Sequence, residues 1–360
     1  GADVFVFQRG YGRLEVDADA GTWNASQSVL RLGPGIAAAD LRATSDAQGH
    51  LYLATGGAGD TVKLDGMMNA GWGGVTAQYG VKEVRLADGA VLGREQLLRL
   101  ATTGTAADER LYGSSWADTI DGGGGNDYAQ GRGGADVFVF QRGYGRLEVD
   151  ADAGTWNAAA SVLRLGPGIG TADLRVTADA DGNLYLTDGA AGDVVKLDRM
   201  MNAGWGGVAQ YGVGAARLAD GTELTREQLI RLATTGTAGD DRLQGSAWAD
   251  AFDGGAGNDT LSGAGGADVY AYARNGGDDV VDDRSGSTGE ADVLRLVDLD
   301  PADVLLGRSG HDLLVTDAST GQSVKVAGHF RSRTENWGVE RIEFADGTAW
   351  DHQTVNAGLW

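Results

Sequence analysis

A glycine-rich nonapeptide with an acidic sixth residue and an apolar eighth residue recurs in register along this chain of 360 residues. Its best copies read GGGGNDYAQ at Gly122–Gln130 and GGAGNDTLS at Gly254–Ser262. Each copy lies in a row of four nine-residue steps, 104–139 (the first array) and 236–271 (the second array). Repetition at a fixed short period predicts stacked supersecondary units that depend on their neighbours.

The nonapeptide combines a turn with oxygen ligands. Its glycines allow backbone conformations that are closed to residues with a Cβ. Such a turn directs carbonyl oxygens inward, and the sixth residue adds a carboxylate; calcium prefers hard oxygen ligands of this kind. The sixth residues are Glu109, Asp118, Asp127 and Asp136 in the first array, and Asp241, Asp250, Asp259 and Asp268 in the second.

The last three residues of each step predict a short strand whose middle side chain points to a core. All eight middle residues are apolar or aromatic, which a flexible glycine-rich linker would not require. They are Leu111, Ile120, Ala129, Phe138, Leu243, Phe252, Leu261 and Tyr270.

These motifs resemble those of the RTX family, the haemolysin-type calcium-binding nonapeptide proteins. The resemblance implies a right-handed parallel β-roll with calcium between turns eighteen residues apart. The carboxylates facing each other would be Glu109 with Asp127, Asp118 with Asp136, Asp241 with Asp259, and Asp250 with Asp268. Backbone carbonyls at positions one and three would be further ligands: Gly113, Gly122, Gly124, Gly131, Gly133, Gly245, Gly254, Ala256, Gly263 and Gly265.

Three departures from the motif predict weaker or empty sites. Glu109 replaces Asp, and Ser115-Trp116 and Ala247-Trp248 stand where glycines belong. The resemblance also implies export by a type I secretion machinery through an uncleaved C-terminal signal. An extracellular location follows from it.

Charge points to a cation as partner. Acidic residues outnumber basic ones by 51 to 29, for a net charge of −22. Without a cation these carboxylates repel, and a glycine-rich array has little apolar area to offset the entropy of ordering it. We therefore expect folding of the arrays to be coupled to calcium binding. The same charge argues against nucleic acid or an anionic membrane as a partner.

Several classes of protein are excluded or disfavoured. The chain has no cysteine, which excludes disulfide scaffolds, thiolate zinc sites and cysteine catalysis. It has no signal peptide and no apolar run long enough to insert in a membrane. It contains neither an HExxH nor a GxSxG motif, and its four histidines are scattered, so we expect surface histidines and no enzyme activity.

A larger repeat surrounds the arrays. Residues 1–25 recur unchanged at 134–158, and a third, diverged copy follows. The flanks at 1–103, 140–235 and 272–360 resemble the segment that follows nonapeptides in haemolysin-type proteins. We expect them to be β-rich, with a short helix before each array. Expected strands are Val29–Leu32, Leu51–Leu53, Thr61–Leu64 and Val84–Leu86, and expected helices are Gly93–Leu100 and Arg226–Leu232.

The third flank (272–360) carries extra acid. Asp278, Asp279, Asp282, Asp283 and Asp292 are its added carboxylates, and Asp279 falls at a ligand position that Leu14 and Leu147 occupy in the other copies. A solvated acidic loop is the alternative. The two Met-Met pairs with their nearby tryptophans, Met67, Met68 and Trp72, and Met200, Met201 and Trp205, predict either core plugs or an interaction surface.

The pattern as a whole predicts an all-β repeat protein in which parallel β-rolls alternate with β-rich flanks. We expect a secreted calcium-binding structural protein of a matrix, S-layer, filament or adhesin. The alternative is the C-terminal secretion and folding-aid region of an RTX enzyme or toxin. The chain begins with Gly and half a nonapeptide, which indicates a segment of a longer protein; a natural C-terminus with its secretion signal is also open. End-to-end association is expected, against a terminal cap in the third copy.

Overall fold

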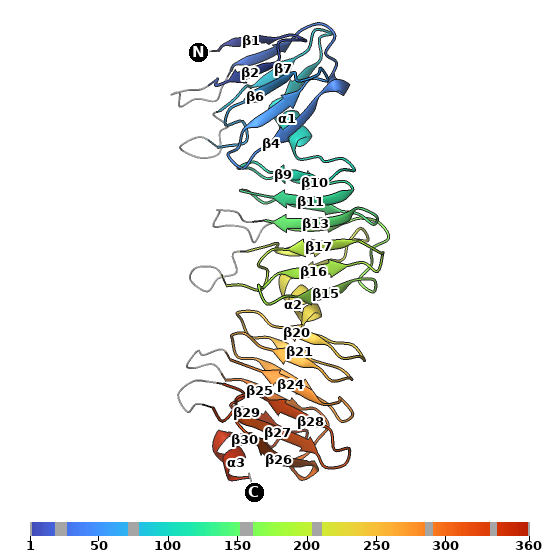
Figure 1. Ribbon diagram of the computed structural model, residues 1–360, viewed down its shortest axis with the longest axis vertical. Coiled ribbons are helices and arrows are strands. Elements are labelled where there is room, and N and C mark those ends of the chain that lie inside the picture. The colour runs from blue at the N-terminus through green and yellow to red at the C-terminus, as the bar shows by residue number, and fades with distance from the viewer. Residues whose placement is uncertain are drawn as a thin grey trace. The chain divides into compact units, whose positions relative to one another are not determined.

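The computed structural model describes residues 2–18, 27–70, 79–151, 161–203, 211–284, 291–331 and 337–358. The chain forms two compact units, and each is described by itself. The first unit comprises 1–174, 187–198 and 210–223, and the second comprises 175–186, 199–209 and 224–360. Both consist mainly of short strands, as the all-β prediction requires (Figure 1). No helix within the described ranges is long and apolar enough to cross a bilayer.

The first flank (1–103) is built from two four-stranded sheets. Each begins with parallel pairing and ends with antiparallel strands. One sheet has the order β1 (Val4–Phe7), β3 (Val29–Leu32), β7 (Glu83–Arg85) and β8 (Val91–Gly93). The other has the order β2 (Arg13–Val16), β6 (Thr61–Leu64), β5 (Leu51–Ala54) and β4 (Arg42–Ser45). Helix α1 (Arg94–Ala101) follows and lies against β4.

The first array forms a parallel β-roll with two nonapeptides per coil. Arg110 pairs with Tyr128, and Thr119 pairs with Val137, so each strand lies beside the strand eighteen residues later. The array strands are β9 (Arg110–Tyr112), β10 (Thr119–Asp121), β11 (Gly125–Gln130) and β12 (Val137–Phe140).

Parallel pairing continues beyond the first array. Strands β13 and β14 add to β11 and β12, and β17 and β18 add next, so the flank extends the roll (Figure 1). These strands are β13 (Gly145–Asp150), β14 (Val162–Leu165), β17 (Val194–Leu197) and β18 (Ala215–Arg217).

The second unit repeats this plan. Helix α2 (Arg226–Ala233) follows directly on β19 (Glu223–Thr225) and lies against β15 (Arg175–Ala178). The parallel strands of the second roll are β20 (Arg242–Gln244), β21 (Ala251–Asp253), β22 (Thr260–Ser262), β23 (Val269–Tyr272), β24 (Asp279–Asp282), β25 (Val293–Leu296), β28 (Ser323–Val326) and β29 (Arg341–Glu343). The remaining elements are β16 (Leu184–Thr187), the antiparallel β26 (Val304–Ser309), β27 (Asp312–Asp317) and β30 (Ala349–Asp351), and helix α3 (His352–Ala357).

The eight inward positions of the nonapeptides are buried, as predicted. The most exposed of them, Leu243, shows 6% of its surface to solvent. The turns stack so closely that only glycine fits at some positions. A Cβ on Gly123, whose φ is +75°, would lie 2.0 Å from the carbonyl oxygen of Thr105, in the stacked turn eighteen residues earlier. The inward side chain is therefore the main apolar contribution of each step, and Val139 is also buried in the last step of the first array.

The predicted flank elements are found, with shifts of one residue in strand β7 and helix α1 and one-residue extensions of strand β5 and helix α2. Met67, Met68, Met200 and Met201 are buried, which supports their role as core plugs; Trp72 and Trp205 lie outside the described residues. The prediction of surface histidines is wrong for His329, which is 2% exposed. His329 stands where the other copies have Met67 and Met200, so it fills an apolar position.

Candidate calcium sites

The acidic sixth residues form a ladder along each roll. One carboxylate oxygen, Oδ1, accepts a hydrogen bond from the backbone N–H of the acidic residue eighteen positions earlier. The donors and acceptors are Glu109 to Asp127 at 2.9 Å, Asp118 to Asp136 at 3.0 Å, Asp241 to Asp259 at 2.8 Å and Asp250 to Asp268 at 2.8 Å. The structure thus places each predicted facing pair side by side.

The later member buries its second oxygen in three of the four pairs. Asp136, Asp259 and Asp268 are at most 1% exposed, and the Oδ2 atom of each has no hydrogen-bond partner. Asp127, the later member of the fourth pair, is 4% exposed. A buried carboxylate oxygen without a partner destabilises the folded state, and a bound cation would supply the missing partner for each of these atoms.

Burial also disfavours the charged form of these groups. Desolvation raises the pKa of Asp127 to about 6, and the nearby Glu109 carboxylate adds to the shift. For the same reason the pKa of Asp136 rises to about 8. The pKa of Asp268 rises to about 9 through burial, with Asp283 as the strongest neighbouring charge. Clustered carboxylates with raised pKa values fit a site whose counterion is a metal.

The first two turns of each array differ from the last two. Each carries Thr or Ser at position two, and this residue donates to the acid of its own turn. Ser114 donates to Asp118 Oδ2 from its N–H at 2.5 Å and its Oγ at 2.7 Å, and Ser246 does the same to Asp250 at 2.5 and 2.8 Å. Thr237 binds Asp241, and Thr105 binds Glu109. Sequence reasoning missed this signal, although Thr or Ser at position two was visible.

The position-one glycines lie against the carboxylates. A Cβ on Gly122, Gly131, Gly254 or Gly263 would lie 2.3–2.5 Å from Oδ2 of the acid in its own turn. A Cβ on Gly113 or Gly245 would instead approach the carbonyl oxygen of Gly131 or Gly263, at 2.5 and 2.4 Å. At position three, Gly124, Gly133 and Gly265 have backbone atoms as their nearest neighbours, and the N–H of Ala256 donates to Thr237 O. Position one thus lies beside the acid of its own turn, and the position-three carbonyls stay a prediction.

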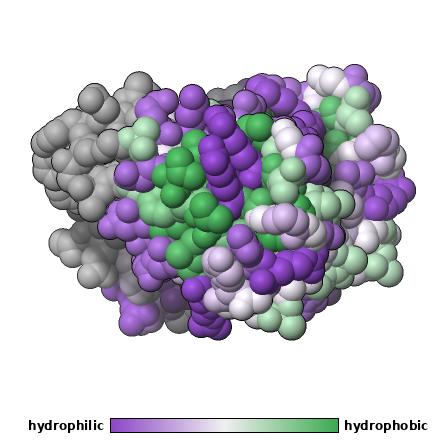
Figure 2. Space-filling model, turned by 90° about the horizontal axis from the view of Figure 1, so that it is seen from above, coloured by the Kyte–Doolittle hydropathy of each residue, from purple (hydrophilic) through white to green (hydrophobic). Residues whose placement is uncertain are grey.

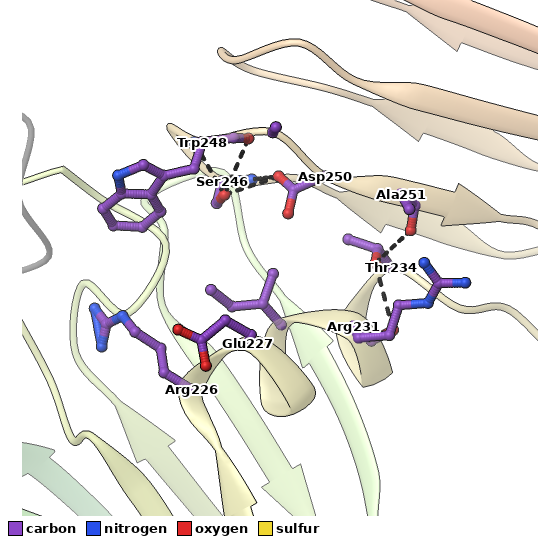
Figure 3. A pocket seen from close by; sticks show the side chains of 10 residues that line it. Arg226, Glu227, Arg231, Thr234, Ser246, Trp248, Asp250 and Ala251 are labelled. Atoms are coloured by element: carbon purple, nitrogen blue, oxygen red, sulfur yellow. Dashed lines mark hydrogen bonds between the residues drawn. The ribbon is translucent and has the colours of Figure 1, made fainter.

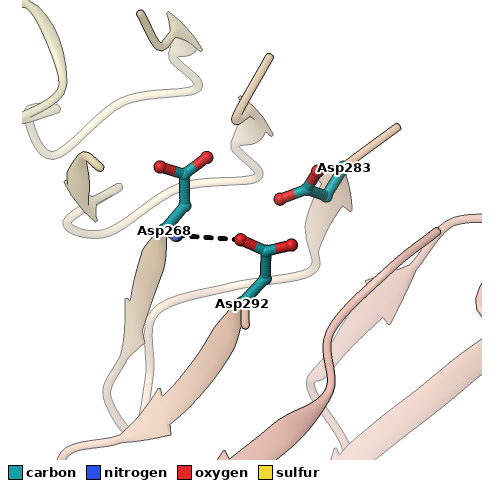
Figure 4. Close-up of side chains that lie close together, drawn as sticks. All are labelled: Asp268, Asp283 and Asp292. Atoms are coloured by element: carbon teal, nitrogen blue, oxygen red, sulfur yellow. Dashed lines mark hydrogen bonds between the residues drawn. The ribbon is translucent and has the colours of Figure 1, made fainter. Parts of the chain in front are cut away.

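Asp279 continues the ladder of the second roll. Its Oδ1 accepts from the N–H of Asp259 at 3.0 Å, its exposure is 4%, and burial raises its pKa to about 7. Asp283 and Asp292 are also fully buried, so a solvated acidic loop is the wrong interpretation for these three residues. Sequence reasoning did not place Asp283 and Asp292 at a site; the structure brings both beside Asp268 (Figure 4).

The tryptophan at position four packs under the preceding helix. In the second unit the Arg226 guanidinium of α2 lies 5.7 Å from the centre of the Trp248 ring, beside a pocket of about 360 Å³ (Figure 3). Arg94 and Trp116 repeat the contact at 6.0 Å in the first unit. The Ser246 hydroxyl in this pocket donates to Asp250, and no histidine lines the pocket, so a serine nucleophile with an imidazole base is not assembled there.

Comparisons with known proteins agree with this geometry. Residues 103–138 and 235–270 match the model of the RTX calcium-binding nonapeptide repeat (four copies), and residues 312–354 match the haemolysin-type calcium binding protein related domain. No curated protein sequence matches the chain significantly. Among solved structures, the extracellular lipase LipA from Serratia marcescens is similar at 20% identity and a TM-score of 0.24; the match covers 64% of this chain and 39% of the lipase chain.

The two arrays are therefore RTX calcium-binding nonapeptide repeats, and the third flank contains a haemolysin-type calcium binding protein related domain.

Proposed function

We propose that this chain is a secreted, repetitive structural protein whose β-rolls fold when they bind extracellular calcium. The observation that supports this most directly is the buried Oδ2 atom without a partner in each array, on Asp136 and on Asp259. Together with the acids that face them and the carbonyls of position one, these residues would hold the ions. Bound calcium would supply the positive charge that the buried carboxylates lack.

Export through a type I machinery fits the same chemistry. An array with one inward apolar residue per nine has little to hold it folded when calcium is scarce. It would remain unfolded inside the cell and fold outside, where calcium is plentiful. A role in a matrix, S-layer, filament or adhesin is proposed because the long duplicated flanks exceed what one calcium-binding array needs. A secretion and folding-aid region of a larger enzyme or toxin is the alternative role.

The calcium ligands can be tested by substitution. Asp127→Ala and Asp259→Ala each remove a buried carboxylate from the best-formed turn of one array. We expect calcium binding in that array to weaken roughly tenfold or more, since affinity follows the number of charged ligands. Asp121→Ala and Asp253→Ala are the matched controls, because these side chains accept backbone hydrogen bonds from Gly123 and Gly255 outside the ladder. Isothermal titration calorimetry that finds equal losses in both sets would contradict the assignment.

We further propose that the chain has no catalytic activity of its own. Each of the described pockets beside α1 and α2 holds two arginines, a tryptophan, a glutamate of the helix and an aspartate that is engaged by its own turn. With calcium present, ester and peptide substrates should be hydrolysed no faster than in buffer. Turnover that disappears on substitution of a pocket residue would overturn this part of the proposal.

Self-association is proposed through the edge strand β1. Val4 and Val6 on this strand are 54% and 51% exposed, and Figure 2 shows apolar side chains gathered on the face seen from above. Within the described residues β1 pairs with β3 alone, and the N–H and C=O groups of its other edge can serve as a template for another strand. Light scattering across a calcium titration should show particles that grow in mass. A monomer at millimolar calcium, unaffected by Val4→Lys and Val6→Lys, would favour a capped module.

A further inference from the structure

Three residues at the end of the second roll replace less polar residues of the first roll. The two rolls are aligned by matching their equivalent strand pairs. In the first roll Val137 pairs with Val162 and Tyr128 with Glu148. In the second roll Val269 pairs with Val293 and Thr260 with Val280. In this alignment Tyr270 replaces Phe138, Asp283 replaces Ala151 and Asp292 replaces Ser161. The three replacements are separated in sequence but not in space: Tyr270 binds Asp283, and Figure 4 shows Asp283 close to Asp292.

The fold does not require a charge at the Asp292 position. In the first roll the Ser161 hydroxyl accepts from the N–H of Asp136 at 3.0 Å. In the second roll Asp292 Oδ1 accepts from the N–H of Asp268 at 2.8 Å. A neutral hydroxyl is sufficient for this hydrogen bond, so the added carboxylate needs another explanation.

The added carboxylates close around an oxygen that has no partner. Asp268, Asp283 and Asp292 are all 0% exposed, and one oxygen from each lies within 4.8 Å of the others. Asp268 Oδ1 is engaged by the N–H of Asp250, whereas Oδ2 has no hydrogen-bond partner. That Oδ2 is directed toward Asp283: a Cβ on Gly263 would lie 2.3 Å from it and 2.8 Å from Asp283 Oδ2.

Neighbouring groups hold the three carboxylates in place. The Tyr270 hydroxyl donates to Asp283 Oδ2 at 2.7 Å, and Phe138 has no hydroxyl to do this in the first roll. The N–H of Asp292 donates to Glu340 Oε2 at 2.7 Å. The site is therefore supported by β23, β25 and the residue before β29.

We propose that Asp268, Asp283 and Asp292 bind one calcium ion at a site that the first roll does not possess. All donors are hard oxygens, and calcium–oxygen distances of about 2.3–2.6 Å allow ligands on opposite sides of the ion to stand about 5 Å apart. Asp268 belongs to the second array and the other two to the third flank, so the ion ties the haemolysin-related flank to the roll. This inference rests on the proposed binding of calcium by the arrays.

The test restores the residues of the first roll. The triple variant Tyr270→Phe, Asp283→Ala, Asp292→Ser is compared with a control, Asp298→Asn with Asp346→Asn, which removes two exposed charges from the same flank. Calcium chloride is titrated calorimetrically into the calcium-stripped full chain. The triple variant should bind one ion fewer than the parent, with the remaining ions bound as before, and the control should bind the parent number.

An unchanged number of ions in a folded triple variant would overturn the proposal. Should the triple variant fail to fold in calcium, the isosteric Asp283→Asn variant decides in the same way, by losing or keeping one ion. Failure of the parent protein to bind any calcium would instead contradict the proposed function. The two failures are therefore distinguishable.

Discussion

Removal of calcium is expected to unfold both arrays. At micromolar protein, a chelator should abolish most of the far-ultraviolet circular dichroism of the β-rolls. The physical reason is that each nonapeptide contributes one inward side chain, while five of the eight sixth residues are buried carboxylates: Asp127, Asp136, Asp250, Asp259 and Asp268. Without a cation, the free energy needed to bury these charges exceeds the stabilisation that the small apolar core provides.

The loss should be local as well as large. The first flank has its own apolar core, which includes Phe7, Leu30, Met67 and Leu97, all 0% exposed. Hydrogen exchange read by mass spectrometry should therefore rise most in 104–139 and 236–271 and less in the strands of this core. A β spectrum that does not change in chelator would show that the rolls are stable without the ion.

The resemblance to RTX proteins implied the roll and its facing carboxylates, and the nine-residue period extended that pairing to every copy. It did so because a fixed period sets the register: once Arg110 lies beside Tyr128, every equivalent pair follows. The inward residues and the ladder partners could thus be named before the structure was known. In the flanks, alternation of apolar and polar residues was enough to predict strands such as Val29–Leu32.

What lay outside the period could not be predicted in the same way. The group of Asp268, Asp283 and Asp292 depends on which strand follows β23 in the sheet, and the chain passes through β24 before reaching it. His329 was assigned to the surface because its type is usually polar, although it stands at a methionine position of the core. A residue-by-residue comparison of the three copies would have pointed to both features. In each case the third copy carries a polar residue where the other copies show what the position normally holds.

Acid is expected to stabilise the calcium-free rolls, the reverse of its usual effect on an acidic protein with paired carboxylates. Burial raises the pKa of Asp136 to about 8 and that of Asp268 to about 9, from the usual value of 3.8. The folded state therefore binds protons that the unfolded chain releases. This contribution is complete below about pH 4 and is lost as the pH rises toward about 8 to 9.

Calcium reverses the order, because protons compete with the ion for the same oxygens. Protein stripped of calcium by a chelating resin should show more far-ultraviolet β signal at pH 4.5 than at pH 7.5, and a higher melting temperature for any transition that remains. Calcium-loaded protein should melt higher at pH 7.5. Acidification also makes the net charge of −22 less negative, which by itself reduces repulsion. The double variant Asp136→Asn with Asp268→Asn is therefore the necessary control. These amides carry no titrating charge, and they should flatten the pH dependence of the calcium-free protein. A calcium-free melting temperature that falls on acidification would show that the buried carboxylates are held ionised without a metal.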